Sequence, residues 1–191
     1  VGQAYLRWQK VAAKFAPKVV VFGFCPENVK RTVNVVRPLY VPEGGIPYSK
    51  PRFVLREGKL ELVNMPTMPS DKLLEVLKNF PESDLAQYEF YFDREDYVTR
   101  FWHYSKFATL VLDLLRVNRV NQEQVRRERD LSFYDLDNEP CRLTLEIVAA
   151  FKQDVERSGA RFLIVHLPAR VDVETLSAGD PLPYAGLLAR H

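Results

Sequence analysis

The stretch that decides the fold runs from Lys18 to Asn34 and reads KVVVFGFCPENVKRTVN. Valines and phenylalanines fill it from Val19 to Phe24, which predicts a β-strand buried on both faces. The residues from Gly23 to Asn28 then predict a turn. Ligands of open α/β sheets bind just beyond the carboxyl ends of the strands, so we expect this turn to carry the functional site.

Helical patterns flank this strand and a second apolar strand further along the chain. A helix over residues 3–16 precedes the first strand, with Ala4, Trp8, Val11 and Phe15 on one face. A helix over residues 144–157, with Leu143, Ile147, Phe151 and Val155 in register, ends at Gly159. It leads into a second buried strand, residues 161–167 (RFLIVHL). This order of elements matches an α/β crossover.

The predicted fold class is α/β, a three-layer sandwich with a flavodoxin-like parallel sheet. The sequence predicts two buried strands, whereas such sheets have about five or six. There is no initiator Met at Val1, and a helical pattern is under way at His191. We therefore expect residues 1–191 to be part of a larger domain.

An insertion over about residues 37–104 interrupts the alternation of strands and helices. Its pattern FVLREGKLELV predicts a β-hairpin turning at Glu57-Gly58. Ser70 is the predicted N-cap of a short helix over residues 71–79, with Leu73, Leu74 and Leu77 facing inward. A dense group of rings follows: Tyr88, Phe90, Tyr91, Phe92, Tyr97, Phe101, Trp102 and Tyr104. These rings could form a lid for a sugar, but we expect them mainly to pack the insertion onto the core.

The remaining segments indicate little specific chemistry. A helix is predicted from about Ser105 to Arg119. The charged run VRRERD, residues 125–130, is expected to be a solvated helix end or loop, because its acids offset its arginines.

Composition excludes several classes of function. The net charge of +2 argues against binding nucleic acid or an anionic membrane through a global field. No apolar run is long enough to span a bilayer. The two cysteines, Cys25 and Cys141, form neither a disulfide framework nor a metal cluster, and we expect no cofactor. The cellular compartment is not decided by the sequence.

Cys25 and Arg31 fit C-x5-R-T, the spacing of a cysteine phosphatase loop. Such a loop directs successive backbone N–H groups at a phosphate beside a thiolate and a guanidinium. Here Pro26 removes one donor and Glu27 adds a carboxylate. We therefore keep a Cys25-dependent phosphatase as a lesser alternative and expect Cys25 to be a small residue at the strand end.

Asn28 is the stronger candidate, because a side-chain amide at the mouth of a strand can donate a hydrogen bond to a developing oxyanion. The segment Gly23-Phe24-Cys25-Pro26-Glu27-Asn28 resembles the third motif block of the SGNH (GDSL-type) hydrolases, which follows a buried strand as G-x-N-D. The order of segments along the chain is also similar to that of a bacterial subset of this superfamily. The order is a helix, a strand, the RPLY segment, a hairpin and then a helix–strand pair. Val29 departs from the pattern, since it stands where Asp is common.

The resemblance implies a serine ester hydrolase or O-acyltransferase acting on a carbohydrate or lipid ester, with Asn28 in the oxyanion hole. The family's nucleophile Ser lies in a G-D-S block, and its Asp and His form D-x-x-H. Neither block is present here, so we expect this chain alone to be inactive. A noncatalytic carbohydrate-binding or scaffold relative is the main alternative.

The histidines and Asp180 do not fit the missing blocks. The D-x-x-H pattern requires Asp three residues before the His. That position holds Arg100 for His103, Leu163 for His166 and Leu188 for His191. His166, at the end of the second strand, could act as a general base but is expected to be structural. His103 is likewise expected to be structural, and Asp180 a turn residue.

Overall fold

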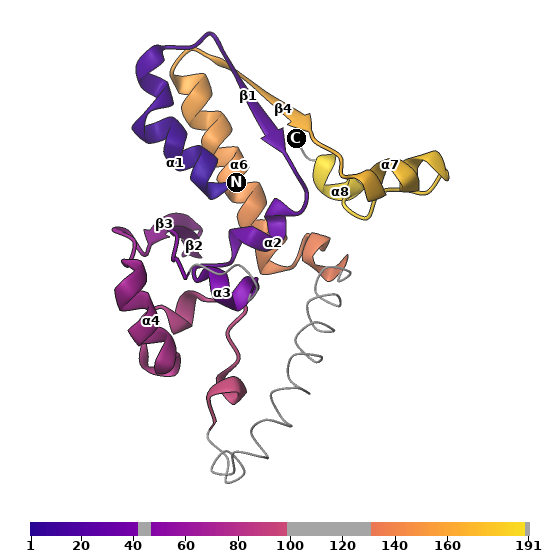
Figure 1. Cartoon of the computed structure of the whole chain (residues 1–191). Helices are drawn as coiled ribbons and strands as arrows, with labels where there is room; N and C mark the ends of the chain where they lie inside the picture. The colour runs from indigo at the N-terminus through magenta and orange to yellow at the C-terminus, as the bar shows by residue number, and fades with distance from the viewer. Residues whose placement is uncertain (42–46, 99–130, 190–191) are drawn as a thin grey trace.

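The computed structural model describes residues 1–41, 47–98 and 131–189 and has a mixed α/β architecture (Figure 1). Strands β1 (Val19–Phe24) and β4 (Arg161–His166) pair in parallel, with Val19 opposite Arg161 and Phe24 opposite His166. The two predicted strands therefore lie side by side in one parallel sheet. The helix predicted over residues 105–119, the run 125–130 and His191 lie outside the described residues.

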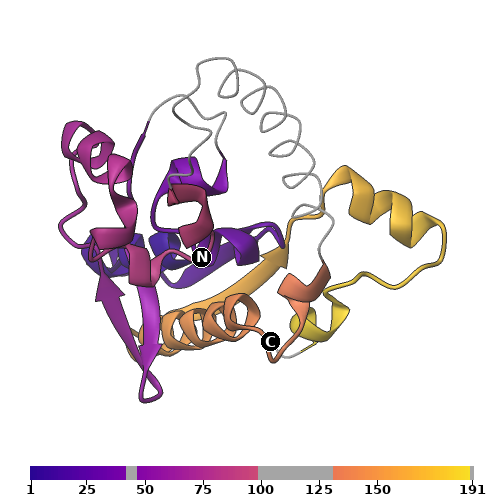
Figure 2. The ribbon, with the colours of Figure 1, turned by 90° about the horizontal axis from the view of Figure 1, so that it is seen from below.

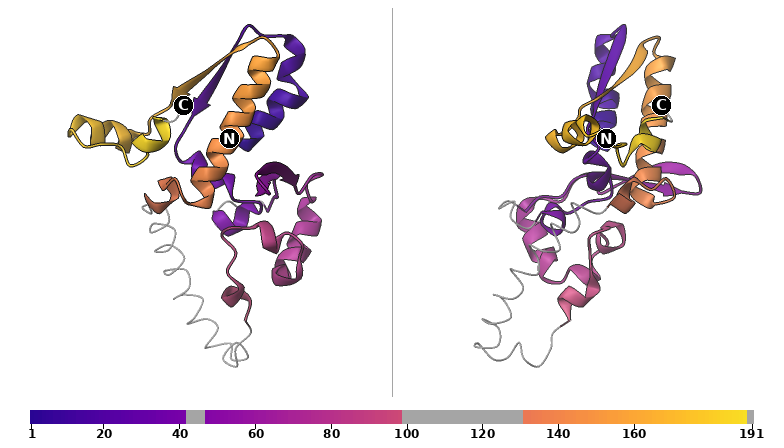
Figure 3. Two further views of the ribbon diagram at one scale, coloured as in Figure 1. Left: turned by 180° about the vertical axis from the view of Figure 1, so that it is seen from behind. Right: turned by 90° about the vertical axis from the view of Figure 1, so that its right-hand side faces the viewer.

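Helices α1 (Gly2–Lys10) and α6 (Glu139–Arg157) cover one face of this sheet and lie side by side in Figures 1 and 3. Phe151 of α6 is the centre of the packing, with ring centroids 5.8 Å from Phe22 and 4.9 Å from Phe162. The predicted core positions of α6 are confirmed, because Leu143, Ile147, Phe151 and Val155 are all buried. The helix begins at Glu139 rather than Thr144, since Pro140 is well suited to a first helical turn.

The prediction that the first strand is buried on both faces is wrong. Phe22 and Phe24 face α6 and are buried, whereas Val21 on the other face is 60% exposed. The same face of β4 presents Leu163 and Val165, both about half exposed. Strand side chains alternate between faces, and the described residues place no helix over this outer face.

The prediction of one continuous apolar helix face over residues 3–16 is also partly wrong. Trp8 is buried, but Val11 is 49% and Phe15 79% exposed. The α-helix ends at Lys10, and a 3₁₀ helix, η1 (Ala12–Phe15), follows it. A 3₁₀ helix turns faster per residue, so the apolar positions no longer share a face.

The predicted hairpin is confirmed as β2 (Arg52–Arg56) paired antiparallel with β3 (Lys59–Val63). Glu57 and Gly58 turn the chain with φ values of 50° and 74°, as a tight two-residue hairpin turn requires. Helix α4 (Ser70–Lys78) follows, but Ser70 is its first residue and not the predicted N-cap, because Pro69 takes the non-helical cap position with a ψ of 149°. Leu73 is fully buried, but Leu74 is 52% exposed, contrary to prediction. Successive helix positions are about 100° apart, so the two leucines do not share a face.

A second, smaller core joins the insertion to the segment just before it and is formed by Val35, Val36, Leu73, Phe80 and Leu85. The hairpin, α3 (Arg37–Tyr40) and α4 lie together at the amino end of α6, as Figure 2 shows from below. The described aromatic residues mostly pack against one another. For example, the ring centroids of Phe80 and Phe92 are 5.1 Å apart, and those of Tyr40 and Tyr91 are 4.8 Å apart. Phe101, Trp102 and Tyr104 lie outside the described residues.

The other described helices are short. Helix α2 (Asn28–Thr32) follows β1, and α7 (Arg170–Ser177) and α8 (Ala185–Leu188) follow β4. The 3₁₀ helices are η3 (Phe80–Glu82), η4 (Ala86–Tyr88), η5 (Arg94–Tyr97) and η7 (Leu131–Tyr134). Helices α2, η7 and α8 thus gather near the carboxyl ends of β1 and β4 (Figure 1).

Candidate functional site

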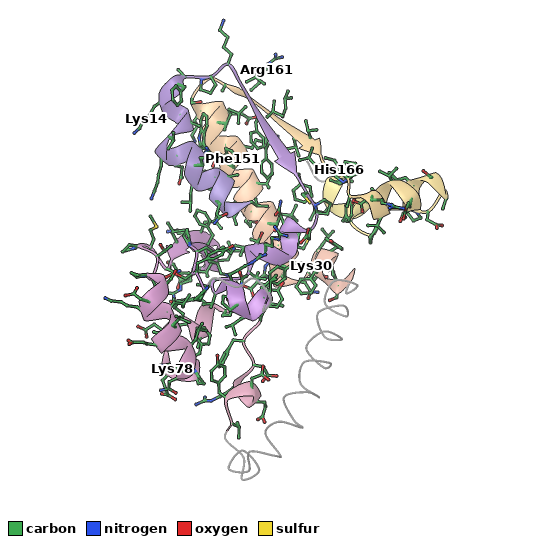
Figure 4. The ribbon with its side chains drawn as sticks, in the orientation of Figure 1. Lys14, Lys30, Lys78, Phe151, Arg161 and His166 are labelled. Carbon is green, nitrogen blue, oxygen red and sulfur yellow. The ribbon has the colours of Figure 1, made fainter. Side chains whose placement is uncertain are left out.

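The residues that the sequence singles out as candidates lie at the carboxyl edge of β1 and β4. Cys25 follows β1 directly, Asn28 begins α2, and His166 is the last residue of β4. The pairing of Phe24 with His166 brings the ends of the two strands together. Figure 4 shows His166 at the tip of β4, on the side of the sheet end where α8 begins.

Asn28 has a fixed main chain and a side chain available for another partner. Its N–H donates to the Cys25 carbonyl at 2.9 Å, and its own carbonyl accepts from Thr32 Oγ1 at 2.8 Å. The neighbouring Val29 is fully buried, and Thr144 of α6 contacts Thr32 at 3.2 Å. Within the described part of the chain, the half-buried side-chain amide of Asn28 has no hydrogen bond. A rigid helix start therefore presents an amide donor at the sheet edge.

The loop containing Cys25 is closed by its own hydrogen bonds. The N–H groups of Asn28 and Val29 donate to the carbonyls of Cys25 and Pro26, both at 2.9 Å. The Arg31 guanidinium pairs with Glu27 at 2.6 Å, one helical turn back. These contacts take two N–H donors and the guanidinium away from the cradle that a cysteine phosphatase needs.

His166 belongs to a polar chain that sequence reasoning missed. Its Nε2 lies 3.1 Å from the hydroxyl of Tyr184, which is 2% exposed. Burial raises the pKa of Tyr184, as does a hydrogen bond to the carboxylate of Asp172. Asp172 is itself held at the start of α7, where its Oδ2 accepts the Ala169 N–H at 2.6 Å.

The Tyr184 hydroxyl can donate to His166 Nε2 or accept from it, and the tautomer of the imidazole decides which. The structural role of His166 stays a prediction, and the described residues give its Nε2 a tyrosine hydroxyl as partner. Asp180 lies in the turn after α7, where its N–H donates to Thr175, as predicted.

Residues of η7 also contact side chains at this edge of the sheet. The Tyr134 ring lies 5.3 Å from Tyr184, and burial, with Asp172 nearby, raises the pKa of Tyr134 to about 12. The ammonium of Lys30, a residue only 4% exposed, lies 5.3 Å from the ring centroid of Phe133. This is a cation–π contact. No local pattern could have predicted these pairings, because their members are far apart in the sequence.

An apolar groove of about 440 Å³ is lined by residues of β1, β4, α6 and α8. Its walls come from the buried faces of the strands and from α6 and α8, and its lining residues include Phe24, Val148, Ile164, His166 and Leu187. A volume of this size falls in the range of small-molecule pockets, roughly 300–1,000 Å³. The groove can accept an apolar group whose polar end lies near His166.

The described residues contain no group of three or more His, Cys, Asp or Glu placed to hold a metal ion. In the same part of the chain, none of the helices has the length and apolar character needed to cross a bilayer. His103 lies outside the described residues.

Comparisons with known proteins add no identification. No family model matches the chain, and neither the curated proteins nor the solved structures include a significant match. The geometry and the residues alone therefore carry the functional argument.

Proposed function

We propose that this chain is part of an SGNH-type serine ester hydrolase, or a related O-acyltransferase, acting on a carbohydrate or lipid ester. The observation that carries the proposal is the position of Asn28 at the start of α2, directly beyond the carboxyl end of β1. Its amide has no hydrogen-bond partner among the described residues, and the helix that presents it is anchored to α6 through Thr32 and Thr144.

In the proposed mechanism, a Ser outside these 191 residues attacks the ester, and a His oriented by Asp accepts its proton. Asn28 donates its amide hydrogen to the oxyanion of the tetrahedral intermediate. The helix start holds this donor in place before the substrate arrives, so little reorganisation is needed as negative charge develops. The apolar groove beside His166 supports a substrate with a hydrophobic acyl or lipid portion.

The finer fold that we propose is a three-layer sandwich with a flavodoxin-like sheet. Support comes from the outer face of the sheet, where Val21, Leu163 and Val165 are 45–60% exposed. Parallel sheets are normally covered on both faces, so an apolar outer face is expected to be covered in the complete domain.

The first test is the sequence of the gene on either side of this chain, which should encode G-D-S before it and D-x-x-H after it. In the complete protein, Asn28→Ala should lower kcat for p-nitrophenyl acetate about 100- to 1,000-fold with little change in KM. Asn79→Ala is the matched control, because Asn79 is an exposed residue after α4 and should leave kcat unchanged.

Two results would refute the proposal. An unchanged kcat in Asn28→Ala removes this residue from the oxyanion hole. Flanking sequence without both Ser and D-x-x-H blocks would instead favour the noncatalytic relative of the same fold.

A further inference from the structure

The apolar groove between α6 and β4 has a definite length and direction. On α6 its lining includes Thr144, Val148 and Lys152, which share one face of the helix. The outer two are eight residues apart, which is about 12 Å at a rise of 1.5 Å per residue. Because α6 and β4 run in opposite directions (Figure 1), Lys152 lies toward the start of β4 and Thr144 toward its end at His166. The groove therefore has a Lys152 end and a His166 end.

The lining suits a hydrocarbon guest and offers few hydrogen-bond partners. Among its described residues, only Thr144, Lys152 and His166 are polar. Thr144 is 1% exposed and donates its hydroxyl to Thr32 at 3.2 Å, so it is already satisfied within the protein. Lys152 is exposed, and a lysine stem can cover apolar surface while its ammonium stays in water. An extended peptide would bring backbone N–H and C=O groups that need partners here, whereas a hydrocarbon chain needs none.

The remaining polar residue, His166, joins one end of the groove to the candidate site. It lines the groove and is also the last residue of β4, where it pairs with Phe24. Asn28 begins α2 at this same edge of the sheet. Leu187 of α8, which is 3% exposed, also lines the groove and adds to its apolar wall. A linear ligand in the groove therefore has one end at the edge where we propose that the oxyanion forms.

We propose that the groove binds the acyl chain of the ester, a linear hydrocarbon whose carbonyl end lies beside His166. The span of the groove sets the length at about eight to ten carbons, since an extended chain advances about 1.2 Å per bond. The inference rests on the proposed ester hydrolysis. It narrows the substrate from any carbohydrate or lipid ester to an ester of a medium-length fatty acid.

The binding test uses the complete protein and the linear alcohols 1-butanol, 1-hexanol, 1-octanol, 1-decanol and 1-dodecanol. The methyl signals of Val148, Ile164 and Leu187 in a ¹H–¹³C spectrum should shift in a saturable way. Kd should fall about fourfold for each added CH₂ up to about ten carbons and then level off, because further carbons lie outside the groove. The proposal is overturned if no alcohol saturates these shifts, because another segment then covers the groove, or if Kd does not depend on chain length.

Leu145→Trp should block the groove, because Leu145 is a half-buried lining residue of α6. Room lost for two CH₂ groups already weakens 1-octanol binding more than about tenfold. Leu74→Trp is the matched control, since Leu74 is 52% exposed on α4, outside the groove, and should leave Kd unchanged. If circular dichroism shows that Leu145→Trp does not fold, Leu188→Trp on α8 blocks the same groove. Equal Kd values in the blocking and control variants would overturn the proposal.

Two further measurements fix the orientation of the chain and separate its binding from catalysis. Decanoate should bind no more tightly than 1-decanol; tighter binding that Lys152→Met abolishes would place the polar end at Lys152 and overturn the proposal. Asn28→Ala should bind 1-octanol as the wild-type protein does, so an unchanged kcat in that variant would refute the oxyanion role and leave the groove in place. A kcat lowered by Asn28→Ala without any alcohol binding would retain ester hydrolysis and overturn the acyl site.

Discussion

Glu89 offers the sharpest test of how the insertion is held to the rest of the chain. Its carboxylate is 5% exposed and accepts four hydrogen bonds. Oε2 accepts from the N–H groups of Val35 and Val36, both at 2.7 Å, and from Asn34 Nδ2 at 3.1 Å. Oε1 accepts from the Tyr91 N–H at 3.0 Å. One buried carboxylate thus ties the segment after α2 to the aromatic segment.

Glu89→Gln changes only the acceptor capacity and the charge. An amide has one oxygen, which can replace Oε2, but its NH₂ group then faces the Tyr91 N–H. One orphaned buried donor costs about 1–3 kcal/mol. The other three bonds lose their charge assistance, which roughly doubles the strength of such bonds. Burial raises the pKa of Glu89, and the N–H donors only partly oppose it, so the substitution also removes a desolvation cost. We expect a net loss of about 2–4 kcal/mol in the free energy of unfolding.

The assay is urea unfolding at about pH 8, well above the usual glutamate pKa of about 4.3, followed by circular dichroism. The midpoint should fall while the slope m stays constant. Hydrogen exchange of the Val35 and Val36 amides should accelerate, which localises the effect to this carboxylate. Glu82→Gln is the control, because the Glu82 side chain is 67% exposed and its contact with Arg94 is 3.9 Å, so its loss should be below about 0.5 kcal/mol. Equal losses in the two variants would refute the reasoning.

Three further outcomes are expected. The pKa of Lys50 is about 8 in the folded chain against 10.5 ordinarily, so the unfolded state binds more protons at this residue between these values. The contribution of Lys50 to stability, measured as the difference between the wild-type chain and Lys50→Met, should therefore rise with pH over that window. Tyr5 and Tyr134, whose pKa values are raised to about 12, act in the opposite direction in both chains. Gly58→Ala should lower the free energy of unfolding by about 1 kcal/mol through its φ of +74° alone, since a Cβ there meets nothing within 4 Å. Gly186→Ala in α8 should be neutral or stabilising. Thermal unfolding measures both effects. Tyr184→Phe should lower stability by about 1–3 kcal/mol and change the ¹⁵N shifts of His166, because Nε2 loses its hydrogen-bond partner; unchanged shifts would contradict this contact.

Local patterns predicted the elements better than their surroundings. The spacing of Leu143, Ile147, Phe151 and Val155 identified the core face of α6, and Glu57-Gly58 identified the hairpin turn. Both signals arise from residues within a few positions of one another, where helix geometry and turn conformation are set locally. The burial of both faces of β1 was predicted wrongly, because an apolar run cannot show which of its faces a helix will cover.

The candidate site shows the same division. Asn28 and His166 could be placed at the carboxyl edge from the sequence, because each follows an apolar run and parallel strands end at the same edge of a sheet. The partner of His166 could not be predicted, since Tyr184 reaches it only after the chain folds back beyond β4. For the oxyanion role of Asn28, the resemblance to a hydrolase motif supplies the hypothesis that kinetics must test.

The sequence by itself determined the two strands, the long helix, the hairpin and the residues that end each strand. Only the tertiary structure decided what the charged groups between these elements face. Lys50 reaches the Arg31 carbonyl, and Arg52 the Glu139 carboxylate, only in the folded chain. The physical reason is that helix and strand periodicity act over a few residues, whereas the environment of a charge depends on every segment that folds around it.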